Sequence, residues 1–414
     1  MTSSSSKAQT ETWWFLPLLA FSVAVAPLSI DMYLPAMTIM GEALNASVAQ
    51  MHLSLSAYLL GYASFHLLSG PLADSYGRKT LLLAGFGLYV LGSLGCAQSE
   101  SIESLIGFRV MQGVGGCVGP TLARTIARDV YGPVDAARAM SLVAMMMAVA
   151  PAIAPLIGGF VLLVWEWPFI FYTLAVYGVI NCLLIFYLLR ETLPVKHAFR
   201  PKVVLANYAE LIKHPQFLWI TGGASLNYAA LMIFLPSAPF VFVTLMGLKT
   251  QHLAFVFVAT VSGYMTGSAI SARASYRFDS PQILLAGACL SVVATIGMSI
   301  GYWLAPMTVA AVAGPMVLYS TSLGLVQPHA MALALKPFGH IAGTGSSLLG
   351  FIQMSTSALA SAFVGQFLVD SAWPMLVGML VLTTSALLTL FWADKTVRRS
   401  SGLTRKRAER APRD

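Results

Sequence analysis

A single carboxylate, Asp31, interrupts an apolar run near the start of the chain. The run from Trp13 to Met37 holds no other charged residue. A carboxylate at membrane depth costs about 2.5–3.5 kcal/mol on insertion scales, so such residues are rare and usually belong to an ion or substrate pathway. A carboxyl group can take up and release one proton. We therefore expect Asp31 to be a proton acceptor on such a pathway.

A cation, Arg109, lies inside another apolar run, 103–124. An uncompensated cation is costly there, so Arg109 is expected to face the interior and to pair with a carboxylate, a backbone carbonyl or water. The alternative is a side chain that snorkels to the membrane surface, because Arg109 stands only about six residues into the run. We favour a role in proton coupling together with Asp31.

Membrane-spanning helices must position these residues. The 414 residues are 57% hydrophobic and 10% charged, whereas soluble domains carry about 25% charged residues. A helical span needs about 20 mainly apolar residues, and the sequence supplies about twelve such segments. Their expected positions are 13–37, 51–73, 79–97, 103–124, 137–164, 167–190, 217–245, 251–272, 281–303, 305–330, 341–368 and 373–394. The expected fold class is an all-α membrane protein with twelve transmembrane helices.

The net charge of +8 orients these spans. Lys and Arg gather in alternate links and in the C-terminal tail. The opposite links carry Glu42, Glu100, Glu103, Glu166 and Asp370, with Lys249 as their only Lys or Arg. The positive-inside rule then places the basic links and both termini in the cytoplasm. Orientation explains the charge, and no nucleic-acid partner is expected.

The longest polar link divides the spans six and six. We expect a cytoplasmic tail at 1–12, an N-terminal six-helix half at 13–190, a cytoplasmic linker at 191–216, a C-terminal six-helix half at 217–394 and a basic cytoplasmic tail at 395–414. Two halves of this kind bind substrate near the midplane between them. Ionisable residues within spans concentrate in the N-terminal half. That half should carry protons, and the C-terminal half should shape the cavity with neutral groups.

The link after the second span reads Gly70-Pro-Leu-Ala-Asp-Ser-Tyr-Gly-Arg-Lys79. Gly70 allows close helix packing, and Gly77 permits a tight turn with positive φ. Asp74 can accept hydrogen bonds from helix N–H groups or pair with a cation such as Arg78. We expect a gating latch that holds one conformation and releases in the other. A solvated turn that only orients the protein is the alternative.

The fifth span contains Pro151-Ala-Ile-Ala-Pro155-Leu-Ile-Gly-Gly159. Two prolines four residues apart remove backbone hydrogen bonds and bend a helix. Gly158 and Gly159 allow a neighbouring helix to approach closely. Pro155, Gly158 and Gly159 are therefore gating candidates, with a purely structural kink as the alternative.

Neutral and aromatic residues are candidates for the wall of a substrate cavity. Tyr58 and Tyr62 stand four residues apart, with His66 one step further, on one helical stripe. Met146 belongs to a run of three methionines that can adapt to varied shapes. The full set of cavity candidates is Tyr33, Tyr58, Tyr62, Met146, Asn227, Gln327 and Gln353. Ordinary helix packing is the alternative for this set.

Enzyme and metal chemistry are not indicated. The sequence has no G-x-x-x-x-G-K-[ST] phosphate loop, so ATP is not expected to supply the energy. No His/Cys cluster has the spacing of metal ligands. The four scattered cysteines contain no C-x-x-C and are interpreted as apolar packing residues. We expect no cofactor, with a proton gradient as the energy source.

Several of these strings resemble a known family. The Gly70–Lys79 loop looks like the signature loop of the major facilitator superfamily. Arg109-Val-Met-Gln-Gly-Val-Gly-Gly116 and Pro151–Gly159 are similar to two further patterns of that superfamily. Ala26-Pro-Leu-Ser-Ile-Asp31-Met-Tyr-Leu-Pro35 resembles the first span of the Bcr/CflA drug-resistance transporters. Further matches are Arg128-Asp129, Glu191–Pro194, Gly339–Ser347 and Ala372-Trp-Pro374, which adds Arg128 to the gating candidates.

The resemblance covers nearly the whole chain and implies drug:proton antiport across the bacterial inner membrane, with bicyclomycin-, chloramphenicol- or sulfonamide-type substrates. The implied fold is the major facilitator fold. The partners would be a small-molecule drug, protons and the lipid bilayer, and we expect a monomer. Two residues depart from the pattern: Ala154 replaces a glycine and His66 replaces the usual glutamine. A proton-coupled exporter of a metabolite or amino acid, an uncoupled uniporter and a non-transporting membrane sensor remain alternatives, although Asp31 argues against the last.

Overall fold

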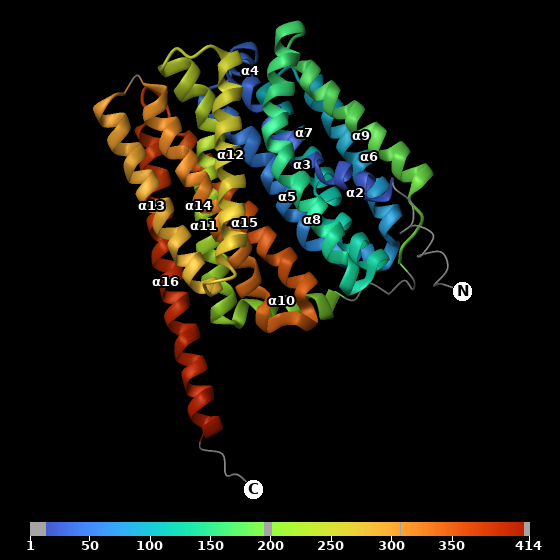
Figure 1. Cartoon of the computed structure of the whole chain (residues 1–414). Helices are drawn as coiled ribbons and strands as arrows, with labels where there is room; N and C mark the ends of the chain where they lie inside the picture. Colours follow the sequence, from blue (N-terminus) through green and yellow to red (C-terminus); the bar gives the residue numbers. More distant parts are fainter. Residues whose placement is uncertain (1–13, 194–200, 307, 410–414) are drawn as a thin grey trace.

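The computed structural model describes residues 14–193, 201–306 and 308–409, including the side chains of all of these except residues 128, 132–148, 251, 394 and 396–409. The described residues form helices and no strand. The N-terminal part consists of α2 (Phe15–Val23), α3 (Val25–Asp31), η1 (Leu34–Ala36), α4 (Met37–Ala43), α5 (Val48–Tyr76), α6 (Arg78–Ala97), α7 (Ile102–Gly116), α8 (Val118–Val164) and α9 (Pro168–Leu188). The C-terminal part consists of α10 (Pro201–Lys213), α11 (Pro215–Ala238), η2 (Pro239–Leu245), α12 (Thr250–Ala274), α13 (Ser280–Leu304), α14 (Val309–Leu335), η3 (Lys336–Ile341), α15 (Ala342–Gly365) and α16 (Trp373–Glu409). Figure 1 shows the two groups of helices side by side.

Each of the twelve predicted spans overlaps one or more helices of the described residues. Eight helical stretches of the described residues are long and apolar enough to cross a membrane, and one of them, Val309–Gly365, covers most of two predicted spans. The 29-residue α5 is not among the eight, because it carries many Ser and His side chains that are buried against other helices. The expected break between 124 and 137 is wrong. There α8 continues as one helix of 47 residues, although the sequence of the link contains Gly132 and Pro133.

The first span is broken at Asp31. α3 ends at that residue, and the chain continues through a short turn into η1 and α4. Pro35 has no N–H, so the backbone carbonyl of Asp31 lacks its α-helical donor. The seventh span is broken at nearly the same distance from its start as the first. Pro236 leaves the carbonyl of Met232 without its α-helical donor, and α11 ends at Ala238, where the π-helical η2 follows. Such paired interruptions in the two halves of a transporter are pointers to its binding site.

Two helix pairs form most of the contact between the halves, α5 with α15 and α8 with α12, and α5 also contacts α11. Near the start of α5, His52 is fully buried, and its Nδ1 lies 3.2 Å from the backbone oxygen of Ser361 in α15. Further along α5, His66 faces Gly350, where a Cβ would lie 2.8 Å from the imidazole ring. The halves also meet beside the broken spans, because α4 contacts η2 and η1 contacts α12.

The predicted linker contains a helix that contacts both halves. α10 lies at the end of the bundle from which the tail of α16 projects (Figure 1). The hydroxyl of Tyr208 donates to the backbone oxygen of Leu67 in α5 at 2.8 Å, and partial burial raises the pKa of Tyr208 to about 12. On the other side, Leu211 is buried in the C-terminal core, and Oε1 of Glu210 lies 3.3 Å from Nε2 of His340.

Candidate functional site

Asp31 lies at the break of the first span, where the two halves meet. The residue is 6% exposed, and among the described residues its side chain makes no hydrogen bond or ion pair. The segments that follow the break contact the other half, η1 against α12 and α4 against η2, so both halves lie near Asp31. A buried carboxylate without a partner has little to stabilise its negative charge. Proton uptake removes that charge.

α8 approaches the same break at Gly158. A Cβ at this position would lie 2.2 Å from the backbone oxygen of Met32, so only glycine fits without movement of α3. The predicted close approach is therefore confirmed at Gly158, and Pro155 is buried one turn earlier. The prediction is wrong at Gly159, where a Cβ would meet no described atom within 4 Å, because successive helical residues point about 100° apart. The prediction of close packing is also wrong at Gly70, where a Cβ would lie 4.0 Å from its nearest described neighbour, Oγ of Ser347.

Arg109 is fully buried in the N-terminal half, which excludes the snorkelling alternative. Its Nη1 donates to the backbone oxygen of Ser29 at 3.1 Å and to Oε1 of Gln112 at 2.6 Å. Its guanidinium carbon lies 4.6 Å from the ring centroid of Tyr33 and 4.5 Å from that of Tyr58. Among the described residues, no carboxylate lies within 4.0 Å of this cation. A backbone carbonyl, an amide and two aromatic faces stabilise its charge instead.

Ser29 connects this arginine to the first span. It stands two residues before Asp31 in α3, and its Oγ shares a hydrogen bond with the hydroxyl of Tyr89 in α6 at 2.7 Å. Gln112 extends the network by donating to Ser93 of α6 at 2.8 Å. Hydrogen bonds therefore join α3, α6 and α7 close to Asp31. Gln112 is visible in the quoted motif, whereas nothing in the sequence distinguishes Ser29, Ser93 or Tyr89 from other polar residues of apolar helices.

Arg78 joins α5, α6 and α8 within the N-terminal half. Its Nη1 lies 2.6 Å from Oδ1 of Asp74 at the end of α5, and its Nε lies 3.1 Å from Oδ2 of Asp129 in α8. Glu191, which follows α9, accepts hydrogen bonds from the backbone N–H groups of Arg78 at 2.8 Å and Lys79 at 3.2 Å. A carboxylate thus caps the N-terminus of α6, where the helix dipole favours negative charge. The sequence predicts the Asp74–Arg78 pair, whereas Asp129 and Glu191 appear there only within family strings.

Gly77 sits at the turn of this latch with φ +103°, and a Cβ there would lie 2.4 Å from Oε2 of Glu191. Gly77→Val should therefore strain the turn by about 1–3 kcal/mol and displace Glu191. We expect the rate of the conformational cycle to fall by about tenfold, with little change in equilibrium substrate affinity. Transport rates and binding isotherms on the same preparation separate the two quantities.

The matched control is Gly87→Val in α6, because a Cβ at Gly87 would meet no described atom within 4 Å. Asp74→Asn should have a smaller effect than Gly77→Val, since Asp74 is half exposed and exposed ion pairs contribute about 1 kcal/mol or less. A loss confined to equilibrium affinity would place the loop in the binding site and contradict the latch.

The aromatic cavity candidates lie inside the N-terminal half. Tyr33 and Tyr58 are wholly buried against Arg109, so neither ring is free to line a cavity in this conformation. Their aromatic faces instead stabilise the guanidinium group. Tyr62 continues the predicted stripe, with its ring centroid 6.4 Å from that of Tyr58 and 5.8 Å from that of His66.

The neutral candidates of the C-terminal half fall in two places. Nε2 of Gln353 donates to Oε1 of Gln327 at 2.8 Å, and Nε2 of Gln327 donates to the backbone oxygen of Ala224 at 3.2 Å. These half-buried amides join α11, α14 and α15. Asn227 is separate and fully buried. Its backbone oxygen accepts from Tyr319, and its two amide atoms have no partner among the described residues.

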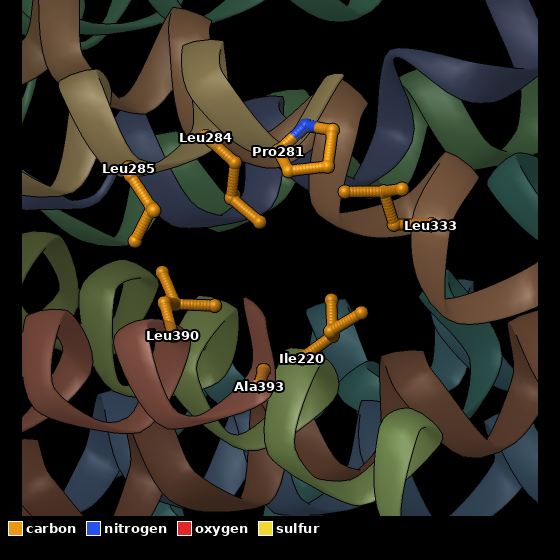
Figure 2. A pocket seen from close by; sticks show the side chains of 7 residues that line it. All are labelled: Ile220, Pro281, Leu284, Leu285, Leu333, Leu390 and Ala393. Carbon is orange, nitrogen blue, oxygen red and sulfur yellow. The ribbon is translucent and has the colours of Figure 1, made fainter. Parts of the chain in front are cut away.

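Figure 2 shows a small apolar cavity in the C-terminal half, with Ile220 and Leu390 on one side facing Leu284 and Leu333 on the other. Its volume of about 20 Å³ holds about one water molecule. None of the predicted cavity residues lines it, and it is too small for an antibiotic. The side chains of Met146 and Arg128 lie outside the described residues, so their roles stay predictions.

Comparison with known proteins places this geometry in context. The model of the Major Facilitator Superfamily matches residues 19–361. The uncharacterized MFS-type transporter YdgK of Bacillus subtilis (strain 168) is 30% identical over 359 residues, which cover 84% of this chain and 87% of YdgK. A bicyclomycin resistance protein homolog of Haemophilus influenzae is 26% identical, with 90% of this chain and 94% of the relative covered. The multidrug resistance protein MdtL of Escherichia coli O157:H7 is 29% identical, with 90% and 93% covered.

Solved structures share the architecture. A bacterial homolog of the human lysosomal transporter Spinster, in an inward-facing and occupied conformation, aligns with a TM-score of 0.71 at 17% identity. The alignment covers 92% of this chain and 97% of that one. At this identity the likeness concerns the fold alone.

Proposed function

We propose that this chain, which belongs to the major facilitator superfamily, is a proton-coupled exporter of small antibiotics from the bacterial cytoplasm. It is a membrane transporter with twelve transmembrane helices in two six-helix halves, and it is not an enzyme. Relatives named for bicyclomycin resistance and multidrug resistance support a drug as the transported molecule.

Asp31 is the observation that carries the proposal. It is buried without a partner among the described residues, at a helix break that both halves approach. Protonation from the outside removes its charge and favours one of the alternating states. A drug that enters from the cytoplasm or the inner leaflet favours release of the proton inwards. Arg109 acts in this cycle through Ser29, which ties it to the same helix.

The proton gradient supplies the energy, without a cofactor. A neutral drug exchanged for one proton uses the membrane potential, worth about 2.3 kcal/mol per charge per 100 mV, and the pH gradient as well. We place the chain in the bacterial inner membrane as a monomer, with both termini in the cytoplasm, in keeping with its basic links. The halves at 13–190 and 217–394 then move against each other about the level of Asp31.

The paired amides of Gln327 and Gln353 support a neutral, polar substrate. Amide groups offer both hydrogen-bond donors and acceptors without a charge. Small neutral antibiotics with several hydrogen-bonding groups, of the bicyclomycin or chloramphenicol type, fit this chemistry, as do sulfonamide-type compounds.

The test is drug uptake into inverted membrane vesicles under an imposed pH gradient, with a panel of these antibiotics. We expect uptake that a protonophore abolishes and that is absent from vesicles without the protein. Uptake that persists with the protonophore would indicate an uncoupled uniporter. Gradient-driven uptake of an amino acid or metabolite, with none of any antibiotic, would reassign the substrate.

A further inference from the structure

A groove runs along the outer surface of the C-terminal half, away from the network around Asp31. α11 forms its floor with Leu218, Trp219 and Gly222, and α15 and α16 flank it with Thr356 and Thr389. Its volume is about 590 Å³, within the range of about 300–1,000 Å³ that small-molecule sites occupy. Because Leu218 and Trp219 are more than 40% exposed on a membrane-spanning helix, the groove opens towards lipid.

The mouth of the groove is positively charged. Lys213, the last residue of α10, lines it, and no described carboxylate lies within 4.0 Å of this lysine. α11 begins two residues later, and its N-cap residue, His214, makes no side-chain capping hydrogen bond. Pro215 has no N–H, but the remaining first-turn N–H groups of this uncapped helix and its dipole favour an anion, phosphate above all.

The length of the groove matches one leaflet of a bilayer. From Pro215 at the mouth to Leu226 at the far end, α11 rises by about 16 Å at 1.5 Å per residue. Half of a hydrocarbon core of about 30 Å is nearly the same distance. Trp219 lies close to the charged end, as aromatic residues do at the membrane–water interface. Beyond it the groove is lined by Gly222, Leu226 and two threonines, and Thr389 satisfies its hydroxyl by donating to the backbone oxygen of Ser385.

We propose that this groove binds one anionic phospholipid of the cytoplasmic leaflet. The headgroup phosphate lies between Lys213 and the N-terminus of α11, and one acyl chain follows Leu218 and Gly222 towards Leu226. An anionic headgroup is selected because a zwitterionic one carries its own cation to offset the phosphate. The site rests on the proposed orientation, with α10 on the cytoplasmic side, and is independent of the identity of the drug.

The test is native mass spectrometry of the purified full-length protein, titrated with phosphatidylglycerol or phosphatidylcholine. We expect tighter binding of phosphatidylglycerol. Lys213→Gln should weaken it by about fivefold, the change that corresponds to about 1 kcal/mol for one basic residue near an anionic surface, and should leave phosphatidylcholine binding unchanged. Gly222→Leu should weaken both lipids because the new side chain fills the floor. A Cβ at Gly222 would make only an ordinary contact of 4.0 Å with Thr389, so this variant should fold.

Lys202→Gln is the matched control, because Lys202 is exposed on the same helix and does not line the groove. Equal losses with Lys202→Gln and Lys213→Gln would reduce the effect to general surface charge and overturn the site. Equal binding of the two lipids by the unmodified protein would overturn it as well. Displacement of the lipid by an antibiotic, with the same sensitivity to Gly222→Leu, would assign the groove to drug instead. Since no transport is measured, these outcomes do not depend on whether export is observed.

Discussion

Asp31→Asn is expected to lower gradient-driven export to the background of vesicles that lack the protein. Asparagine keeps the size of the protonated aspartic acid and cannot release a proton, so coupling is lost while the packing of α3 persists. Exchange of labelled for unlabelled drug requires no net proton movement and should therefore continue. The two activities are measured in the same inverted vesicles, with and without an imposed pH gradient.

Glu42→Gln is the matched control for this experiment, because it removes an exposed carboxylate just beyond the same span. It should change neither activity. Asp31→Glu keeps the carboxyl group at a shifted position and should retain part of the coupled export. Full gradient-driven export by a well-folded Asp31→Asn protein would contradict the assignment of Asp31 as the proton acceptor.

Arg109→Lys should impair coupled export strongly although the positive charge is kept. A lysine cannot lie flat between the rings of Tyr33 and Tyr58 and still donate to both Ser29 and Gln112, because an ammonium lacks the planar fork of a guanidinium. A desolvated cation–π contact alone contributes about 2 kcal/mol, so we expect the rate of export to fall by about tenfold or more. Export at several external pH values, at equal amounts of folded protein, measures the effect.

Arg190→Lys provides the comparison, since Arg190 is exposed at the end of the N-terminal half. It should leave both the rate and its pH dependence unchanged. Normal export at every pH by Arg109→Lys would mean that positive charge alone suffices at this position. The hydrogen bonds and ring contacts of Arg109 would then serve packing only.

The helices were predictable from sequence because each apolar run must satisfy its own backbone within the membrane. The breaks were harder to predict. Pro35 and Pro236 are visible in the sequence. However, whether a proline within a span bends the helix, breaks it or leaves it continuous depends on what packs against it. α14 contains Pro315 and Pro328 and continues through both. Local sequence therefore does not distinguish these cases.

Side-chain partnerships were predictable where they are local. Asp74 and Arg78 stand four residues apart, on either side of the turn between α5 and α6, and they form the expected ion pair. Glu191 reaches the same turn from more than a hundred positions away, and only the packing of α9 against α6 brings it there. The same holds for Arg109, for which a carboxylate was one expected partner. The backbone carbonyl of Ser29, which is distant in sequence, stabilises its charge instead. So do the rings of Tyr33 and Tyr58, which were predicted to line a cavity.

The two broken spans bear on how a transporter of this kind tolerates change during evolution. Pro35 and Pro236 each free a backbone carbonyl, that of Asp31 and that of Met232, from its helical hydrogen bond. A carbonyl acceptor does not depend on the side chain of its own residue. Substitutions nearby therefore alter the shape of the region and leave the acceptor in place. Such a chain can diverge in the molecules that it recognises, while its backbone continues to offer the same hydrogen-bond acceptors within the membrane.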